Sequence, residues 1–343
     1  MKKVFLLLSV IVLSSCSTKN GTTIKTSSTK EASDYFSTIT TDQLRANLTV
    51  IASDEMEGRD TGSEGQKKAG RFIVDFYQKN GIAFPKGASS YYQPIPAAYL
   101  NAKRNENLKD SENIWAFIEG SEKPEEIVVV SAHYDHIGTR GGQVYNGADD
   151  DGSGTVGIME IAAAFQKAKN EGHGPKRSVL IIHMTGEEHG LHGSRFYSEN
   201  PLFPLANTVA NVNIDMIGRR DNLHPDTNKY IYLIGSDYLS TDLYNLCEAV
   251  NKKNNLLALD YKYNDKKDPN RFYYRSDHYN FAKNGIPSVF LFNGTHEDYH
   301  RATDEIDKIE FDALTLRTQY AFAIAWEIAN RKDKLVVDKT DGR

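Results

Sequence analysis

The residues of this 343-residue chain that could do chemistry lie in a few short segments. His133 and Asp135 stand in "SAHYDHIG", directly after the apolar run IVVV. Glu187 and Glu188 follow VLIIHM in "TGEEHGLHGS", and Asp215 ends VANVNI in "NIDMIG". Several predicted strands thus carry an imidazole or a carboxylate at the carboxyl end, where open α/β sheets build their sites. Imidazole combined with carboxylates favours zinc or a similar transition metal.

A further acidic segment, "NGADDDGSGT", holds Asp149, Asp150 and Asp151 between glycines. Adjacent like charges that face inward need a cation to offset the cost of burial. The same string, with Glu160 at its twelfth position, also fits an EF-hand calcium loop. An EF-hand requires a helix before the loop, but here a strand and a glycine-rich stretch precede it. A transition-metal site is therefore favoured over a non-enzymatic calcium-loop or binding protein.

The elements that must position these residues are strands alternating with helices. Short runs that are apolar on both faces indicate buried strands at Ile114–Ile118, Ile127–Val130, Val179–Met184, Val209–Ile214, Tyr230–Ile234 and Val289–Phe292. Helical spacing of apolar residues predicts helices at Thr41–Ile51, Glu64–Asn80 and about 153–168, 238–251, 275–284 and 309–330. The predicted fold class is α/β, a three-layer α/β/α sandwich around a central, largely parallel (mixed) sheet.

The N-terminal segment has the pattern of an export signal. Two lysines precede the apolar run Val4–Leu13, which is too short to span a bilayer, and "LSSC" follows it. The pattern resembles the lipobox of bacterial lipoproteins, which implies a signal peptide over residues 1–15 and lipidation at Cys16. Residues 16–38 are rich in Ser, Thr and Lys and are predicted to be a flexible tether. We expect an exported protein, lipid-anchored to a bacterial envelope membrane at the outer membrane or the periplasmic face.

The overall composition excludes two classes of protein. The net charge of −5 without basic runs argues against a nucleic-acid partner. Only two cysteines occur, so no disulfide framework supports the fold. No obligate protein partner is evident. We expect a single catalytic domain over residues 39–335.

Taken in order with "HEDYHRATDEIDKI", these segments resemble the co-catalytic di-zinc exopeptidases, and the chain resembles a bacterial zinc-dependent aminopeptidase of this family. Relatives include glutamate carboxypeptidase II, transferrin receptor and glutaminyl cyclase. The stretch "ASDEMEGRDTGSEGQKKAGRFIVDFY" resembles the region before the catalytic core of bacterial members. The resemblance extends from about residue 42 to residue 330, and it leaves no room for the large protease-associated insertion of some relatives.

The resemblance implies two Zn²⁺ ions per chain, or other divalent transition metals, and five ligands: His133, Asp150, Glu188, Asp215 and His300. Within this set Asp150 would bridge the two metals. Asp135 would orient His133, and Glu187 would be the general base of metal-assisted hydrolysis. His296 also precedes the last motif, but the following Thr303-Asp304 favours His300 as the ligand.

Other polar residues near the motifs are not expected to bind the metals. Ser276, Asp277 and His278 resemble a family loop near the substrate pocket, and Tyr299 precedes the last ligand. His136, His189 and His192 match no ligand position and are interpreted as loop or supporting residues.

The function implied is a metallo-exopeptidase that removes N-terminal residues from peptide substrates. Dipeptidase or carboxypeptidase action stays open, because no residue proves that the pocket reads a free amino terminus. A glutaminyl cyclase-like acyltransferase is the alternative, but that branch carries Trp where this chain has Tyr299. A non-enzymatic relative like transferrin receptor is disfavoured because every ligand position is occupied by a suitable residue.

Overall fold

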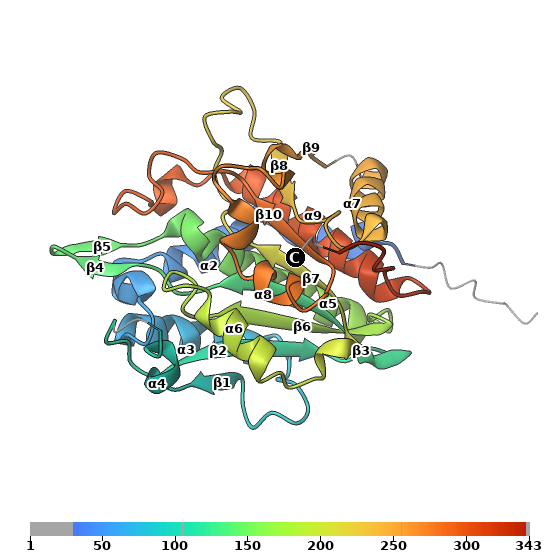
Figure 1. Cartoon of the computed structure of the whole chain (residues 1–343), viewed down its shortest axis with the longest axis horizontal. Helices are drawn as coiled ribbons and strands as arrows, with labels where there is room; N and C mark the ends of the chain where they lie inside the picture. The colour runs from blue at the N-terminus through green and yellow to red at the C-terminus, as the bar shows by residue number, and fades with distance from the viewer. Residues whose placement is uncertain (1–29, 104–105, 255, 341–343) are drawn as a thin grey trace, which may run out of the picture. The chain divides into compact units, whose positions relative to one another are not determined.

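A computed structural model describes residues 30–103, 106–254 and 256–340. Eight strands form one sheet in the spatial order β1-β2-β6-β3-β7-β10-β8-β9 (Figure 1). Their bounds are β1 Tyr92–Ile95, β2 Ser111–Ile118, β3 Lys123–His133, β6 Arg177–Met184, β7 Thr208–Ile214, β8 Tyr230–Ile234, β9 Ala258–Asp260 and β10 Ser288–Phe292. A separate hairpin pairs β4 (Gly138–Arg140) with β5 (Gln143–Tyr145).

The centre of the sheet is parallel and its flanks are mixed. Strands β6, β3, β7 and β10 run parallel to one another, whereas the β1–β2, β2–β6 and β8–β10 pairs are antiparallel. The parallel strands are buried on both faces: Val128 and Val130 of β3 join one core cluster, while Ile127 and Val129 join another. This alternation explains why the strands read as continuous apolar runs in the sequence.

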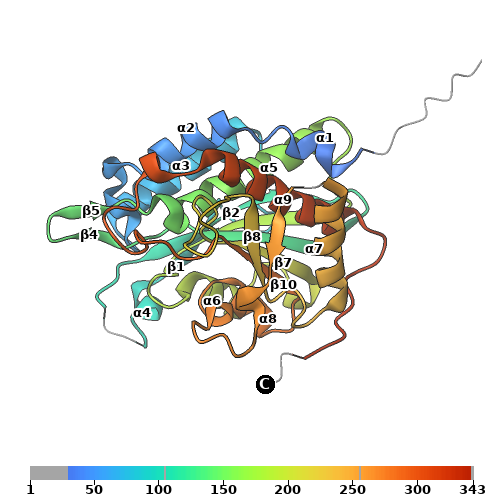
Figure 2. The same cartoon turned by 90° about the horizontal axis from the view of Figure 1, so that it is seen from above.

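Helices cover both faces of the sheet, so that the predicted α/β class is confirmed (Figure 2). Helices α1, α2, α3, α5 and α9 lie on one side and α6 and α8 on the other. The helices span α1 Ala32–Phe36, α2 Thr41–Ile51, α3 Glu64–Lys79, α4 Ala97–Leu100, α5 Gly154–Asn170, α6 His192–Glu199, α7 Thr241–Asn254, α8 His278–Ala282 and α9 Phe311–Asn330.

The folded part of the chain begins earlier than the predicted boundary at residue 39. Helix α1 lies inside the predicted tether, and its Ala32 and Tyr35 are buried. The Tyr35 ring packs on Trp326 of α9, with the ring centroids 5.2 Å apart. A five-residue helix with a few core contacts in a Ser- and Thr-rich stretch leaves no periodic apolar pattern, which is why the sequence indicated a tether here.

The predicted signal peptide at residues 1–15 and the lipidation site at Cys16 lie outside the described residues. Among the helices that the structure describes, none is long and apolar enough to cross a membrane.

Candidate metal centre

The carboxyl ends of four neighbouring parallel strands converge at one edge of the sheet. His133 ends β3, Glu187 and Glu188 follow β6, Asp215 follows β7, and the loop after β10 carries His300. Because β6, β3, β7 and β10 are adjacent in the sheet, residues far apart in sequence meet at this edge.

Asp150 joins two groups of side chains at this edge. Its Oδ1 lies 3.3 Å from His133 Nε2, which is also 3.5 Å from Asp215 Oδ1. Its Oδ2 lies 3.2 Å from His300 Nε2, which is also 3.1 Å from Glu188 Oε2. The carboxylate thus presents one oxygen to a His133–Asp215 pair and the other to a His300–Glu188 pair.

These separations fit metal ligation. Ligand atoms bound at about 2.0–2.2 Å around a tetrahedral zinc lie roughly 3.3–3.6 Å from one another, within a few tenths of an ångström of the observed values. Asp150 Oδ2 and Glu188 Oε1 are buried and accept no hydrogen bond from the described residues. Buried anionic oxygens need such a partner. The residues present therefore fit a pair of divalent ions that share Asp150.

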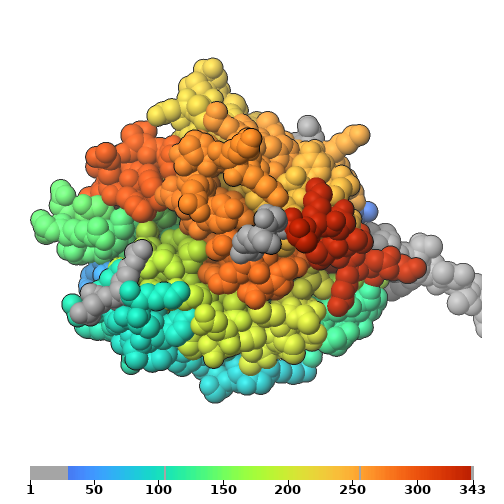
Figure 3. All heavy atoms as spheres, viewed as in Figure 1, coloured from blue at the N-terminus to red at the C-terminus, as the bar shows by residue number. Residues whose placement is uncertain are grey.

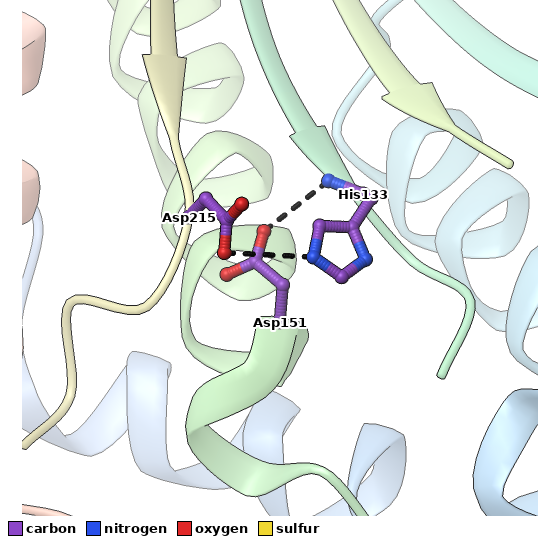
Figure 4. Close-up of side chains that lie close together, drawn as sticks. All are labelled: His133, Asp151 and Asp215. Atoms are coloured by element: carbon purple, nitrogen blue, oxygen red, sulfur yellow. Dashed lines mark hydrogen bonds and ion pairs between the residues drawn. The ribbon is translucent and has the colours of Figure 1, made fainter. Parts of the chain in front are cut away.

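Asp151 also lies beside His133 and Asp215, and the three could be taken for one ligand group (Figure 4). Its oxygens are already used: Oδ1 accepts from the main-chain N–H of Gly154 (2.9 Å) and Met216 (3.0 Å), and Oδ2 accepts from that of His133 (3.2 Å). Asp151 therefore fixes the start of α5 and the loop after β7, and Asp150 remains the candidate for a carboxylate shared by two ions.

The calcium-loop interpretation is wrong for this segment. Asp149 Oδ1 accepts from Gly218 N at 2.6 Å, and its Oδ2 lies 3.1 Å from His296 Nε2. Glu160, the twelfth position of the calcium string, is on α5 and accepts from Asn47 Nδ2 at 2.8 Å. The carboxylates at the ends of the string thus point to protein donors, and His296 is held away from the metal centre.

Gly147 allows the chain to turn sharply before Asp150. Its φ is +53°, and a Cβ added there would lie 2.2 Å from the Asp150 carbonyl oxygen. A side chain at this position would displace the backbone that carries Asp150.

Asp135 has a different contact from the one expected. The Nδ1 of His133 is 3.0 Å from the main-chain carbonyl of Asp135 but 3.8 Å from its carboxylate. That carboxylate accepts instead from Thr61 Oγ1 (2.9 Å) and from the main-chain N–H of Glu187 (3.2 Å). Asp135 thus orients the imidazole through its backbone, and its side chain positions Glu187.

Glu187 is largely buried near His133 and Asp215, with its side chain 10% exposed and its Oε2 3.9 Å from His133 Nε2. Burial raises the pKa of the Glu187 carboxyl well above its usual value. Burial also opposes ionisation of Glu188, but His136 and His300 outweigh it and lower the pKa of Glu188 to about 2. The pKa values of these two adjacent glutamates are therefore shifted in opposite directions, as expected for an acid–base group beside a metal ligand.

His136 belongs to the centre, although its sequence position matched no ligand. Its Nδ1 lies 2.7 Å from Glu188 Oε1 and 3.9 Å from Asp150 Oδ2. The shorter distance is below the spacing of two zinc ligands, so the His136 ring contacts the Glu188 carboxylate directly, although the two atoms do not meet in hydrogen-bond geometry. The geometry therefore favours His136 as a polar neighbour of Glu188 and His300 as the second candidate imidazole ligand.

Arg59 is a second functional residue that the sequence did not reveal. It is fully buried and donates to the carbonyls of Tyr134 (3.0 Å), Asn146 (2.6 Å), Gly147 (3.0 Å) and Ile51 (2.8 Å). It thereby joins the segment after His133 to the segment before Asp150. Its partners are remote in sequence, and an arginine in a polar stretch carries no sign of burial.

The predicted substrate-binding residues separate into two kinds. Tyr299 lines a cavity of about 40 Å³ together with Phe272, Phe290, Phe292 and Arg275. Ser276 does not line it, because its hydroxyl donates to Asp215 Oδ2 at 2.6 Å. Asp277 and His278 are also absent from its lining and are fully buried, so neither lies where the resemblance placed it, at the surface of the substrate pocket.

Fold and site together define an α/β sandwich with two adjacent groups of His, Asp and Glu side chains that could hold metal ions. Residues 113–325 match the pattern described as peptidase family M28, and the chain belongs to that family. The expected class, a member of a peptidase family, is confirmed.

Two curated relatives are similar over part of the chain. Leucine aminopeptidase 1 of Penicillium rubens is 30% identical over 53% of this chain and 47% of its own length. The vacuolar membrane protease of Emericella nidulans is 36% identical over 43% of this chain and 14% of its own length. The aligned segments thus span less than two thirds of either relative.

Solved structures share the fold at low sequence identity. The LapA aminopeptidase of Legionella pneumophila is 20% identical, with a TM-score of 0.65 over 88% of this chain and 75% of that one. The zinc aminopeptidase BSAP of Bacillus subtilis is 16% identical, with a TM-score of 0.66 over 86% and 96%. Glutaminyl cyclase of Porphyromonas gingivalis is 18% identical, with a TM-score of 0.63 over 84% and 98%.

Proposed function

We propose that the protein is a two-zinc exopeptidase that removes residues from the amino terminus of peptides. The observation that carries this proposal is the position of Asp150, whose two oxygens face separate His–carboxylate pairs. His133 and Asp215 would hold one ion, Glu188 and His300 the other, with Asp150 shared between them. Bound there, zinc would supply a water of lowered pKa and polarise the scissile carbonyl.

Glu187 is the proton carrier in this proposal. Its raised pKa lets it take the proton of the attacking water and pass it to the leaving amine, and the Asp135 carboxylate fixes its backbone. Glu187 and Asp215 also line the small cavity, where their carboxyl oxygens are placed to accept hydrogen bonds from the α-ammonium group of a substrate. Tyr299 lines the same cavity and stacks on His300, with ring centroids 3.9 Å apart, so that it would contact the terminal residue.

The cellular location is a proposal from the sequence pattern alone. The apolar run before Cys16 supports export and lipid attachment in a bacterial envelope, and mass spectrometry of the mature chain would identify acylation at Cys16.

The activity is tested with peptides that carry a free or an acetylated N-terminus, in the presence of zinc and of a chelator. The proposal predicts that free amino acids are released only when the peptide has a free N-terminus and zinc is present. Equal cleavage of acetylated peptides would overturn the exopeptidase assignment. Formation of pyroglutamate from an N-terminal glutamine, without amino-acid release, would favour the glutaminyl cyclase alternative.

A further inference from the structure

Two cavities meet at the metal centre, and they differ in size and lining. The small one, of about 40 Å³, is lined by Glu187, aromatic rings and His300. The other, of about 440 Å³, is lined by Glu106, Ile137, Arg140, Glu188, His189 and His300. Because Glu187 and Glu188 are consecutive, the chain passes between the two cavities at this point.

The size difference between the two cavities predicts which end of a peptide occupies each of them. An enzyme that removes one residue needs a pocket that ends after one side chain, and the small cavity satisfies this requirement. The remainder of the peptide, which becomes the leaving group, then occupies the wide cavity. This assignment of the two sides rests on the proposed function.

Most charged groups around the wide cavity already have partners. The two ring nitrogens of His189 contact Asp60 Oδ1 (2.9 Å) and the Glu106 carboxylate. Glu188 contacts His136 and His300. Arg140 is different: it is exposed, and within the described part of the chain its side chain makes no hydrogen bond or ion pair.

The backbone that carries Arg140 is well anchored. Arg140 ends β4 and pairs with Gln143 of β5, and this hairpin lies at the surface beside the segment around residue 300 (Figure 3). Arg59 donates to carbonyls on both sides of the hairpin, at Tyr134 and at Gly147. The guanidinium is thus presented from a fixed element at the rim of the wide cavity.

We propose that Arg140 binds a carboxylate of the leaving group, so that the enzyme prefers short peptides with a free C-terminus. A guanidinium is suited to hold a carboxylate by two parallel hydrogen bonds. On the leaving side of a short peptide, that carboxylate is the chain terminus or an acidic side chain. Arg140 is then a specificity residue of the enzyme and does not act on the reacting bond.

The test compares Leu-Gly-Gly, its C-terminal amide, and Leu-Gly-Asp amide as substrates of the zinc-loaded full chain. The wild-type kcat/KM is expected to fall roughly 10-fold on amidation, mainly through KM, as for the loss of one charge-assisted hydrogen bond. In Arg140→Gln the acid and amide should be hydrolysed alike, and Arg140→Lys should retain part of the preference. If the wild-type kcat/KM for Leu-Gly-Asp amide equals that for Leu-Gly-Gly, a side-chain carboxylate binds Arg140 as well as a chain terminus does.

Arg275→Gln is the matched control, because Arg275 lines the small cavity on the other side of the metal centre. This variant should preserve the ratio of kcat/KM for acid over amide. Equal hydrolysis of acid and amide by the wild type, or an unchanged ratio in Arg140→Gln, would overturn the role of Arg140 while leaving the peptidase proposal intact. Absence of hydrolysis of every peptide by zinc-loaded protein would instead contradict the proposed function.

Discussion

At the residue scale, three acidic side chains of the candidate metal centre have different roles. Asp150 faces both His–carboxylate pairs, two imidazoles lower the pKa of Glu188, and burial raises the pKa of Glu187. Glu187 and Glu188 are adjacent in sequence, yet they line different cavities. Substitutions that remove similar charges should therefore differ in their effects on turnover and on metal content.

Glu187→Gln removes the proton carrier and no proposed ligand. The variant should bind as much zinc as the wild type and keep its unfolding midpoint, while kcat falls by about 10²–10⁴-fold or more. Metal analysis, thermal unfolding and turnover of an unblocked peptide check the three expectations on one preparation. A metal-replete Glu187→Gln protein with full activity would remove Glu187 from the mechanism.

His300 and His136 should differ in what their loss does to metal content. His300→Ala deletes a proposed ligand and should release about one zinc per chain. His136→Gln deletes an imidazole that contacts the Glu188 carboxylate without being a proposed ligand, so zinc should still bind, at an affinity about 10–100-fold lower. Competition with a calibrated chelator measures both affinities. If His136→Gln loses an ion and His300→Ala keeps both, the two imidazoles have been assigned the wrong way round.

At the element scale, the parallel strands bring the ligands together, and Arg59 holds the loop between two of them. Four carbonyls from three separate segments accept hydrogen bonds from this one buried guanidinium. The loop between β3 and α5 carries the β4–β5 hairpin and ends at Asp150, so its order depends on Arg59.

Arg59→Lys should destabilise the protein by about 2–4 kcal/mol, because one ammonium group cannot reach all four carbonyls and leaves some of them unsatisfied. Arg71→Lys is the control: Arg71 is exposed on α3 and pairs with Glu64, so its replacement should cost less than about 0.5 kcal/mol. Denaturant unfolding of both variants gives the free energies. Equal effects of the two substitutions would contradict the anchoring role of Arg59.

Elements with a continuous apolar pattern could be predicted from the sequence, and those held by single contacts could not. The run VLIIHM predicts β6 because both faces of that strand are buried. Helix α6 has only eight residues, and three of its four buried residues are His192, Gly193 and Ser194, so no continuous apolar pattern marks it. The motif positions indicated the ligands, whereas the contacts of His136 and Arg59 depend on residues brought close only by the fold.

At the scale of the whole molecule, a buried histidine makes the free energy of unfolding depend on pH. His183 of β6 is fully buried, its Nε2 lies 2.6 Å from the Tyr77 hydroxyl, and burial lowers its pKa to about 3. The unfolded chain takes up this proton near pH 6.5, while the folded chain does not until about pH 3. The contribution of His183 to stability is therefore complete above about pH 6.5 and is lost as the pH falls through this window.

His183→Gln removes this proton uptake and retains a polar partner for Tyr77. Between about pH 6.5 and pH 4.5, the free energy of unfolding of the variant should fall less steeply than that of the wild type, by up to about 1.4 kcal/mol per pH unit. Denaturant unfolding at several pH values measures the slope. Identical slopes for the two proteins would show that His183 is protonated in the folded state.

The central claim is that this sheet edge is a peptidase centre that works with two zinc ions. The most direct measurement is a titration of the metal-free full chain with zinc, recording bound metal and turnover of an unblocked peptide on the same samples. We expect no turnover in the metal-free protein and full turnover at about two bound zinc ions per chain. Full turnover in protein stripped of metal, or no turnover with both ions bound, would contradict the account.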